Sequence, residues 1–439
     1  MSTQKRIFAL IGTIIIISSL LAACSGTATP TSAPVTNAPV VAAATNTLAA
    51  PQQVTITVMT NRVGTQAQLL QELANKFMQE NPTIKVDFSA PGADYEKLMK
   101  VKMAANDMPD VFSTHGWAKI RYGAFLLDLR DQPWAANLDP AIKPAVTDDT
   151  GKVYVLPMDQ EKTGPAFNAD ILKEYGVDVP LTWKDFMAAC ETIKTKSEGK
   201  VACVHMGGAD SWPVGQYYDF FSTALAVSPT PNDAKALLDG TYDWKKYTVL
   251  SQNLLDLKTK GYLNVDALTA KYTDSAAALA EGKAAFGFYG PFICDEALKT
   301  NPKFNCGIMP IPTLVEGDKP TFAGGELTTW GVWKDSKNKD AAIKFVDFFA
   351  QPENVKAVAE SNKVPAGLTG VKVDAGYLTQ YYEKYADLRT FTYFDRVYLP
   401  NGMWDVLCKN GQDVLAGGIA PEQATENIAK EYVRLRASQ

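Results

Sequence analysis

Aromatic, acidic and basic residues suited to ligand binding follow several predicted strands of this 439-residue chain. Flat rings pack on the apolar faces of a ligand, while carboxylate, amide and guanidinium groups hydrogen-bond to its hydroxyl groups. This combination favours a neutral polyol over an anion, which would require more Arg and Lys at helix starts. The candidate rings are Trp117, Trp212, Tyr289, Phe292 and Trp330. The candidate polar residues are Asn61, Arg62, Asp159, Glu161, Asp210, Glu326 and Arg396, and Gly324 and Gly325 would let the backbone approach a ligand.

Several of these candidates also have a purely structural explanation. Trp212 and Trp330 are large apolar residues that would equally suit a hydrophobic core. Asp159 and Glu161 would also be explained as carboxylates that face water between two lobes. The pair Gly324-Gly325 would also suit a tight turn. The sequence leaves these alternatives open.

Catalysis and metal binding find less support in the sequence. A glycan-cleaving enzyme needs two carboxyl groups at a set separation, and no motif commits any two of Asp159, Glu161 and Glu326 to that role. The chain has two histidines, His115 and His205, and no CxxC pair, so we expect neither a zinc site nor another metal site. We therefore expect a protein that is not an enzyme and carries no cofactor.

Alternating strands and helices are predicted to position the candidates. Residues 54–58 and 84–88 alternate apolar and polar side chains like strands, and residues 66–80 have apolar side chains at helical spacing. A strand, a helix and a strand joined closely form a right-handed unit with parallel strands. Because ligands bind at the carboxyl ends of parallel strands, we expect the loops at 60–64 and 113–117 to line a site.

Further along the chain, the pattern stays mixed. Thr182 is predicted to cap a helix over residues 183–195, with Asp185 at the reciprocal position of a capping box. The last hundred residues are predicted to be helical, with Trp404 and Leu407 in one core stripe. The sequence thus predicts an α/β body of two lobes, since about 385 residues exceed what one core usually organises.

The first residues have the features of an export signal. Lys5 and Arg6 precede an apolar run over residues 7–21, and Leu21-Ala22-Ala23-Cys24 resembles the lipobox of bacterial lipoproteins. The resemblance implies that residues 1–23 are removed and that Cys24 carries a lipid; an ordinary signal that happens to leave a cysteine is the alternative. Residues 24–53 lack charge and are rich in Thr, Ala and Pro, which predicts a disordered tether. We expect an extracytoplasmic protein, lipid-anchored to the cell membrane.

The net charge limits the class of binding partner, and the cysteine content limits the possible disulfides. The formal net charge of −5 argues against nucleic acid as a partner, and we expect a monomer. Export permits disulfides. Cys190 with Cys203, and Cys294 with Cys306, would each join a predicted helix to the strand that follows it; buried free thiols are the alternative. Cys408 is left over and is expected to be buried on an amphipathic helix.

Six motifs in one order carry a resemblance to a known family. Together they resemble the carbohydrate-binding branch of the extracellular solute-binding proteins of ABC importers, relatives of the maltose-binding protein. One departure concerns Phe292, which stands where many relatives carry Trp, with Tyr289 before the glycine. The motifs are Tyr-Gly-x-x-x-Pro-x-Thr-Trp-x-x-Phe over residues 175–186, Glu-Gly-Lys-Ala-Ala-Phe over 281–286 with Gly290-Pro291 after it, Gly324-Gly325, residues 336–345, Val364-Pro365-Ala366 and residues 416–424.

The resemblance implies a fold and a function. The fold is a two-lobe, periplasmic-binding-protein-like α/β fold of class II type, with parallel-rich sheets flanked by helices and three interlobe crossings. The lobes would be residues 54–160 plus 318–365, and residues 163–315 plus 370–439. A mono- or oligosaccharide would bind in the interlobe cleft and pass to ABC permease subunits and their ATPase. A binding protein for a non-sugar solute, such as a peptide or a polyamine, is the alternative.

Overall fold

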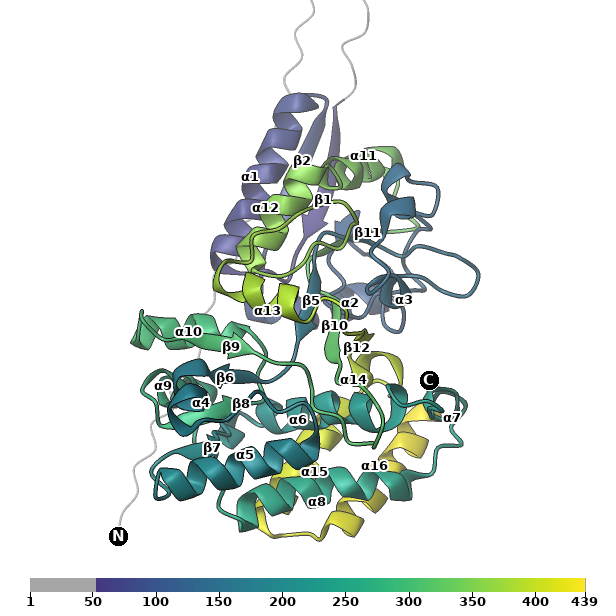
Figure 1. Ribbon diagram of the computed structural model, residues 1–439. Coiled ribbons are helices and arrows are strands. Elements are labelled where there is room, and N and C mark those ends of the chain that lie inside the picture. Colours follow the sequence, from purple (N-terminus) through teal and green to yellow (C-terminus); the bar gives the residue numbers. More distant parts are fainter. Residues whose placement is uncertain (1–52, 439) are drawn as a thin grey trace, which may run out of the picture. The chain divides into compact units, whose positions relative to one another are not determined.

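The computed structural model describes residues 53–438. The predicted signal peptide, Cys24 and nearly all of the predicted tether lie outside this range. Helices alternate with strands of three sheets through most of the described chain (Figure 1). Among the described residues, no helix is both long enough and apolar enough to cross a membrane.

Five strands form the first sheet, in the order β2-β1-β3-β11-β4. Strand β1 (Val54–Met59) runs parallel to β2 (Ile84–Ser89) and to β3 (Val111–Phe112), which confirms the predicted strand–helix–strand unit. Strand β11 (Thr329–Val332) is antiparallel to β3 and to β4 (Leu156–Pro157). Strand β11 starts at the edge of the sheet where β1 and β3 end, and it therefore runs in the opposite direction.

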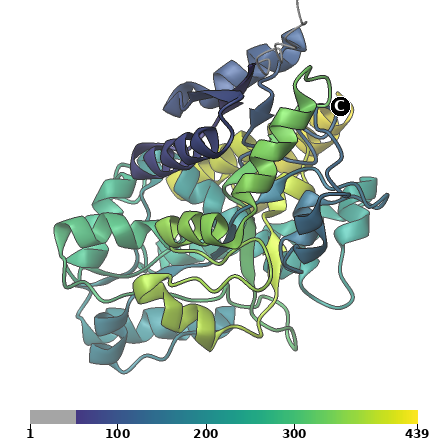
Figure 2. The ribbon, with the colours of Figure 1, turned by 90° about the horizontal axis from the view of Figure 1, so that it is seen from above.

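Helices from distant parts of the sequence pack beside this sheet. Helix α1 (Gly64–Glu80) contacts both α11 (Lys339–Phe349) and α12 (Pro352–Asn362) (Figures 1 and 2). Helix α2 (Tyr95–Ala105) leads to β3. Three short helical segments complete this region: η1 (Gly92–Asp94), η2 (Pro133–Asn137) and α3 (Lys143–Val146).

Four strands form the second sheet, in the order β7-β8-β6-β9. Strand β7 (Ala202–Val204) is parallel to β8 (Ala284–Gly287), whereas β6 (Ala166–Asn168) is antiparallel to β8 and to β9 (Cys306–Ile308). Parallel and antiparallel pairs therefore occur in both large sheets, which are mixed rather than parallel-rich.

Helices also join distant segments around the second sheet. Helix α15 (Met403–Ala416), near the end of the chain, packs on α6 (Trp212–Ser222) and α8 (Thr248–Thr259) (Figure 1). The hydroxyl of Thr182 accepts the N–H of Asp185 at 3.1 Å and so caps α5, as predicted. The other helical segments here are α4 (Ala169–Tyr175), α5 (Trp183–Lys196), η3 (Gly208–Asp210), the π-helical turn η4 (Thr223–Val227), α7 (Ala234–Asp239), η5 (Trp244–Tyr247), α9 (Tyr272–Ala280), α10 (Phe292–Thr300) and α16 (Pro421–Arg436).

Two disulfides brace helices against the second sheet. Cys190 on α5 is bonded to Cys203 on β7, with 5.0 Å between their Cα atoms. Cys294 on α10 is bonded to Cys306 on β9, with 5.7 Å between their Cα atoms. Cys408 is buried on α15, and burial raises the pKa of its thiol to about 12.

A third sheet of three strands, β12-β10-β5, connects the two larger ones. Strand β5 (Gln160–Thr163) is antiparallel to β10 (Phe322–Glu326), and β12 (Thr390–Thr392) is parallel to β10. The prediction of a wholly helical C-terminal segment is wrong at β12, because β10 offers it a free edge for hydrogen bonding. The helical segments around it are η6 (Gly376–Leu378), α13 (Thr379–Lys384) and α14 (Phe394–Val397).

Each large sheet has a hydrophobic core of its own. One core gathers buried residues from 56–158 and 330–368. Another gathers buried residues from 167–311 and 393–432, together with Ala323 of β10. The two cores draw on interleaved parts of the sequence, as expected when a chain crosses between lobes several times.

Trp330 lies within the first core. Its side chain is fully buried, and its ring centroid lies 5.8 Å from that of Phe345 and 5.6 Å from that of Phe349. The helices beside the sheet enclose this ring, so it has no face open to a ligand. We therefore leave Trp330 out of the candidate site.

Replacing Trp330 by Ala should lower the free energy of unfolding by about 3–5 kcal/mol, because it opens a large cavity between packed rings. Urea denaturation followed by circular dichroism measures this loss. The matched control is Phe292→Ala, since that ring is 42% exposed and its removal leaves no enclosed cavity. Equal losses in both variants would contradict the placement of Trp330.

Candidate ligand-binding site

The close approach of β10 to β5 builds the floor of the site. Gly324 pairs with Lys162, and Gly325 pairs with Glu161. A Cβ atom on Gly324 would lie 1.9 Å from the carbonyl oxygen of Glu161, so no side chain fits there. A Cβ atom on Gly325 would be 3.8 Å from the guanidinium of Arg396, so the glycines bring the backbone of β10 against candidate residues.

Asp159 holds three connecting segments together at this floor. Its carboxylate accepts the N–H of Thr328 at 2.6 Å and the hydroxyl of Thr328 at 3.1 Å, and it also accepts the amide of Asn362. The side chain is fully buried. Burial raises the pKa of Asp159 to about 6, and the positive charge of Arg62 opposes that shift. Asp159 therefore connects separate segments through buried hydrogen bonds and is not a carboxylate facing water.

A cavity of about 340 Å³, the first chamber, opens beside this floor. Arg62, Glu161 and Phe292 all line it. The Nε atom of Arg62 and the Oδ1 atom of Asn362 are buried there without a hydrogen-bond partner in the described chain. Burial lowers the pKa of Arg62, against the charges of Asp159 and Glu161. Unpaired buried polar atoms are costly, and both atoms belong to residues that line this chamber.

Four aromatic rings form a cluster, of which Phe292 lines the first chamber. Trp212 begins α6, and its ring centroid lies 5.3 Å from Tyr272, 5.6 Å from Tyr289 and 5.8 Å from Phe292. Tyr289 is buried, and its hydroxyl accepts the N–H of Gly207 at 2.6 Å. Tyr289 therefore supports the cluster from inside, while Phe292, which is 42% exposed, presents its ring to the chamber.

Asp210 positions this aromatic cluster. Its carboxylate accepts the backbone N–H of Tyr272 at 2.7 Å, at the first turn of α9. A carboxylate at a helix N-terminus pairs with the unsatisfied N–H groups there. Asp210 thereby anchors the helix that carries the Tyr272 ring.

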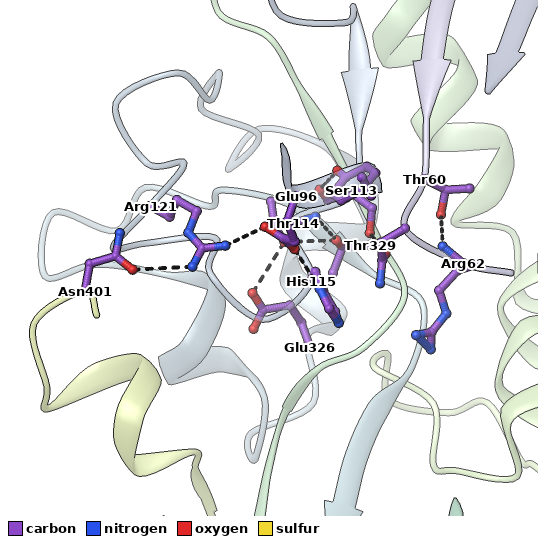
Figure 3. A network of polar contacts seen from close by, with 12 residues as sticks. Thr60, Arg62, Glu96, Ser113, Thr114, His115, Arg121, Glu326, Thr329 and Asn401 are labelled. Carbon is purple, nitrogen blue, oxygen red and sulfur yellow. Dashed lines mark hydrogen bonds and ion pairs between the residues drawn. The ribbon is translucent and has the colours of Figure 1, made fainter. Parts of the chain in front are cut away.

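The loop after β3 lies between two groups of candidates. The hydroxyl of Ser113 donates to the side-chain oxygen of Asn61 at 2.8 Å. Glu326 accepts the N–H of Ala118 at 3.0 Å and is only 2% exposed, and burial raises its pKa. Asn61 and Glu326 therefore hold this loop in place. Figure 3 shows the loop between Arg62 on one side and Arg121 with Asn401 on the other.

His115, on this loop, and Arg121 share the carboxylate of Glu96 on α2. His115 Nδ1 lies 2.8 Å from one oxygen of Glu96, and Arg121 donates to the other oxygen at 2.6 Å (Figure 3). Burial lowers the pKa of His115, and its hydrogen bond with Glu96 opposes this. Arg121 also donates to Asn401 at 3.4 Å, which links the loop to the segment before α15.

A second cavity, the second chamber, has a volume of about 330 Å³ and lies beyond this loop. The guanidinium of Arg121 lies 4.0 Å from the ring centroid of Trp117, and that of Arg396 lies 4.8 Å from it. These cation–π contacts mean that the Trp117 ring is already packed. The other walls include Gln216, Asn401 and Trp404.

A buried carboxyl pair positions Arg396. Asp219 is fully buried and accepts the backbone N–H of Asp395 at 2.8 Å. Burial raises the pKa of Asp219, and the neighbouring charge of Asp395 raises it further. Arg396 follows on α14, where its guanidinium lies 4.4 Å from the ring centroid of Tyr393. The pair therefore fastens α14 to α6, so that Arg396 lies over the two rings.

A larger cavity of about 600 Å³ lies elsewhere, between residues 315–319 and 387–389. Its main charges pair with each other, since Arg389 donates to Asp318 at 3.1 Å. No aromatic ring lines it. The two chambers are therefore the candidate ligand site. The described residues hold no group of three potential metal ligands of the His, Cys, Asp or Glu type.

Sequence reasoning missed three residues that the second chamber brings together. Trp404 was expected in a core stripe, but its side chain is only partly buried and lines the chamber. Gln216 and Asn401 carried no motif. The one signal was the type of Gln216, since an amide in an otherwise aromatic stretch of α6 needs a hydrogen-bond partner.

The pH dependence of stability should report the buried state of Asp159. Because its pKa is about 6 in the fold and 3.8 in an ordinary setting, the ionised carboxylate lowers stability above pH 6. This penalty should vanish as the pH falls towards 4. The stability of the wild type relative to Asp159→Asn should therefore rise by about 2 kcal/mol between pH 7 and pH 4. Urea unfolding at each pH measures this difference, and a flat difference would contradict it.

Comparisons with known proteins identify the family. A model for bacterial extracellular solute-binding proteins matches residues 63–356. The chain is 43% identical over 366 residues to the melibiose/raffinose/stachyose-binding protein MelE of Bacillus subtilis (strain 168), across 83% of this chain and 86% of that protein.

Solved structures share the fold. A Bacillus subtilis binding protein in an open conformation matches with a TM-score of 0.84 at 40% identity, over 88% of this chain and 98% of that one. A Bacillus licheniformis sugar transporter protein in complex with stachyose matches with a TM-score of 0.75 at 42% identity, over 87% and 100%. The predicted two-lobe α/β fold is thereby confirmed. The chain belongs to the bacterial extracellular solute-binding proteins.

Proposed function

We propose that this protein binds a neutral oligosaccharide of the raffinose type in the two chambers and delivers it to an ABC importer. The observation that carries the proposal is the first chamber, which is lined by a guanidinium-bearing residue, Arg62, a carboxylate-bearing residue, Glu161, and a 42% exposed ring, Phe292. Sugars need such a pairing of hydroxyl partners and a flat apolar surface. The binding of melibiose, raffinose and stachyose by the relative MelE supports this ligand class.

The conformation supports delivery by closure. At similar identity, the chain matches the open relative with a TM-score of 0.84 and the stachyose-bound relative with 0.75. We infer that the described form is the open one and that a sugar bridging both lobes shifts the population towards a closed form. The lobes would be residues 54–160 plus 318–365 and residues 163–315 plus 370–439. The closed monomer would then be recognised by permease subunits coupled to an ATPase.

Hydrolysis of the sugar finds little support in the site. Glycoside hydrolysis needs two carboxyl groups that flank the bond to be cleaved. The carboxylates of Asp159 and Glu326 are buried and accept hydrogen bonds from Thr328 and Ala118. Of the three candidates, only Glu161 lines the first chamber.

Calorimetry tests the proposed function. Melibiose, raffinose and stachyose should bind with micromolar or tighter affinity, while spermidine and a peptide mixture should not. Glu161→Ala should weaken raffinose binding by roughly 10- to 100-fold, because a hydrogen bond to a charged group contributes about 1.5–3 kcal/mol. Glu72→Ala, at an exposed position of α1, is the control and should bind like the wild type. Absence of binding to all three sugars would refute the proposal.

The N-terminal segment is proposed to anchor the protein through a lipid on Cys24. Cys24→Ala should move the protein from the membrane fraction to the soluble fraction and remove the lipid mass from its N-terminal peptide. Mass spectrometry and fractionation measure both changes. Cys408→Ala is the matched control, because this thiol is buried on α15 and should leave the anchor intact. Membrane retention of Cys24→Ala would contradict the anchor.

A further inference from the structure

We propose that Asp219 and Asp395 share one proton, and that this pair of one neutral and one charged carboxyl group positions Arg396 for ligand binding. The inference rests on the proposed function, since Arg396 lines the second chamber. It makes Asp219 a positioning residue, because its side chain acts on the ligand site only through Asp395 and Arg396.

The two carboxyl groups lie together where α14 packs on α6. Asp219 on α6 is 0% exposed, and the side chain of Asp395 on α14 is 8% exposed. The backbone N–H of Asp395 donates to Oδ1 of Asp219 at 2.8 Å, whereas Oδ2 of Asp219 is buried without a hydrogen-bond partner in the described chain. A buried charge with an unsatisfied oxygen is costly. A proton on Oδ2 removes the charge and makes this oxygen a donor.

Carboxyl groups outnumber guanidinium groups around the pair in the described part of the chain. The charges of Glu161 and Glu326 also act on the guanidinium of Arg396. Arg121 adds a second positive charge beside Asp395. Because like charges repel strongly in a buried site, one carboxyl group binds a proton. Three further titratable groups act on the pair or are acted on by it, and burial raises the pKa of each, so they add no charge at pH 7: Tyr247 on η5, Tyr393 before α14 and Cys408 on α15.

The pKa directions of the two groups fit a proton on Asp219. Burial raises the pKa of Asp219, and the charge of Asp395 and a hydrogen bond between the two side chains raise it further. Burial also raises the pKa of Asp395, but the charge of Arg396 and the same hydrogen bond oppose this rise. One hydrogen bond acts in opposite directions on two acids when one donates the proton and the other accepts it. Asp219 is therefore the donor and Asp395 the charged acceptor.

Arg396 is the residue through which the pair acts on the candidate site. Its guanidinium lies 4.8 Å from the ring centroid of Trp117 and 4.4 Å from that of Tyr393. A Cβ atom on Gly116 would lie 2.1 Å from Nη1 of Arg396, so the loop after β3 packs directly on this side chain. Ionisation of Asp219 would place two negative charges side by side and loosen α14 from α6. Arg396 and the loop would then lose their fixed positions.

Infrared spectroscopy and unfolding at several pH values test the shared proton. The difference spectrum between the wild type and Asp219→Asn at pH 7 should contain the C=O stretching band of a protonated carboxyl group. The folding equilibrium constant of the wild type, relative to that of Asp219→Asn, should fall about tenfold per unit between pH 5 and pH 7, because only the folded wild type keeps this proton there. A missing band, or a ratio that does not change with pH, would refute the shared proton.

Calorimetry with raffinose tests the positioning role. Asp219→Asn should bind within about threefold of the wild type at pH 7, because an amide both accepts the N–H of Asp395 and donates to its carboxylate. Asp219→Ala should weaken binding by roughly tenfold or more, because it removes both hydrogen bonds that hold α14. Asp347→Asn is the matched control and should bind like the wild type. It replaces another carboxyl group whose pKa burial raises, on α11, away from the lining of both chambers.

The outcomes separate the two proposals. If the wild type binds none of the three sugars, the proposed function fails, while the infrared band and the pH dependence of unfolding still decide where the proton is. If the wild type binds raffinose but Asp219→Asn and Asp219→Ala lose the same affinity, or neither loses any, the positioning role is refuted. Thermal unfolding checks that each variant is folded. Should Asp219→Ala not fold, the affinity of Asp219→Asn decides, since a loss of more than tenfold in this isosteric variant refutes a neutral donor.

Discussion

The contact between β10 and β5 is the constraint on which the rest of the structure depends. Gly324 lets the two strands approach until no Cβ atom fits between them. The paired strands connect the two large sheets, and each sheet has its own hydrophobic core. The candidate site is built around this connection, because Glu161 of β5 lines the first chamber.

Buried carboxylates link separate segments around that connection. Asp159, Glu326 and Asp219 are each at most 2% exposed. Each accepts hydrogen bonds from backbone N–H groups of another segment. Burial disfavours the charged form of a carboxylate. This effect outweighs the hydrogen bonds, so burial raises the pKa of all three. These acids therefore organise the backbone, and Glu161 is left to face the chamber.

The walls of each chamber come from segments far apart in the chain. Phe292 begins α10 and Trp404 lies on α15, whereas Arg62 follows β1 and Trp117 follows β3. A ligand that contacts both walls would bind a closed form more tightly than an open one. The difference between these two binding free energies sets how far such a ligand shifts the population towards the closed form.

The sequence by itself determined the local features of this protein. Alternation and helical spacing predicted the unit of β1, α1 and β2, and residue types predicted the Thr182 cap. Motif order predicted the family. These features depend on neighbours in the sequence, so the residue pattern contains them.

Only the tertiary structure decided which candidate side chains face a ligand. Trp330 and Trp404 look alike in sequence, yet helices beside the first sheet enclose Trp330, and Trp404 lines a chamber. Asp159 and Glu161 stand two residues apart, yet only Glu161 faces a chamber, because Thr328 and Asn362 take the Asp159 carboxylate. Exposure depends on segments hundreds of residues apart in the chain, and local spacing holds no information about where those segments pack.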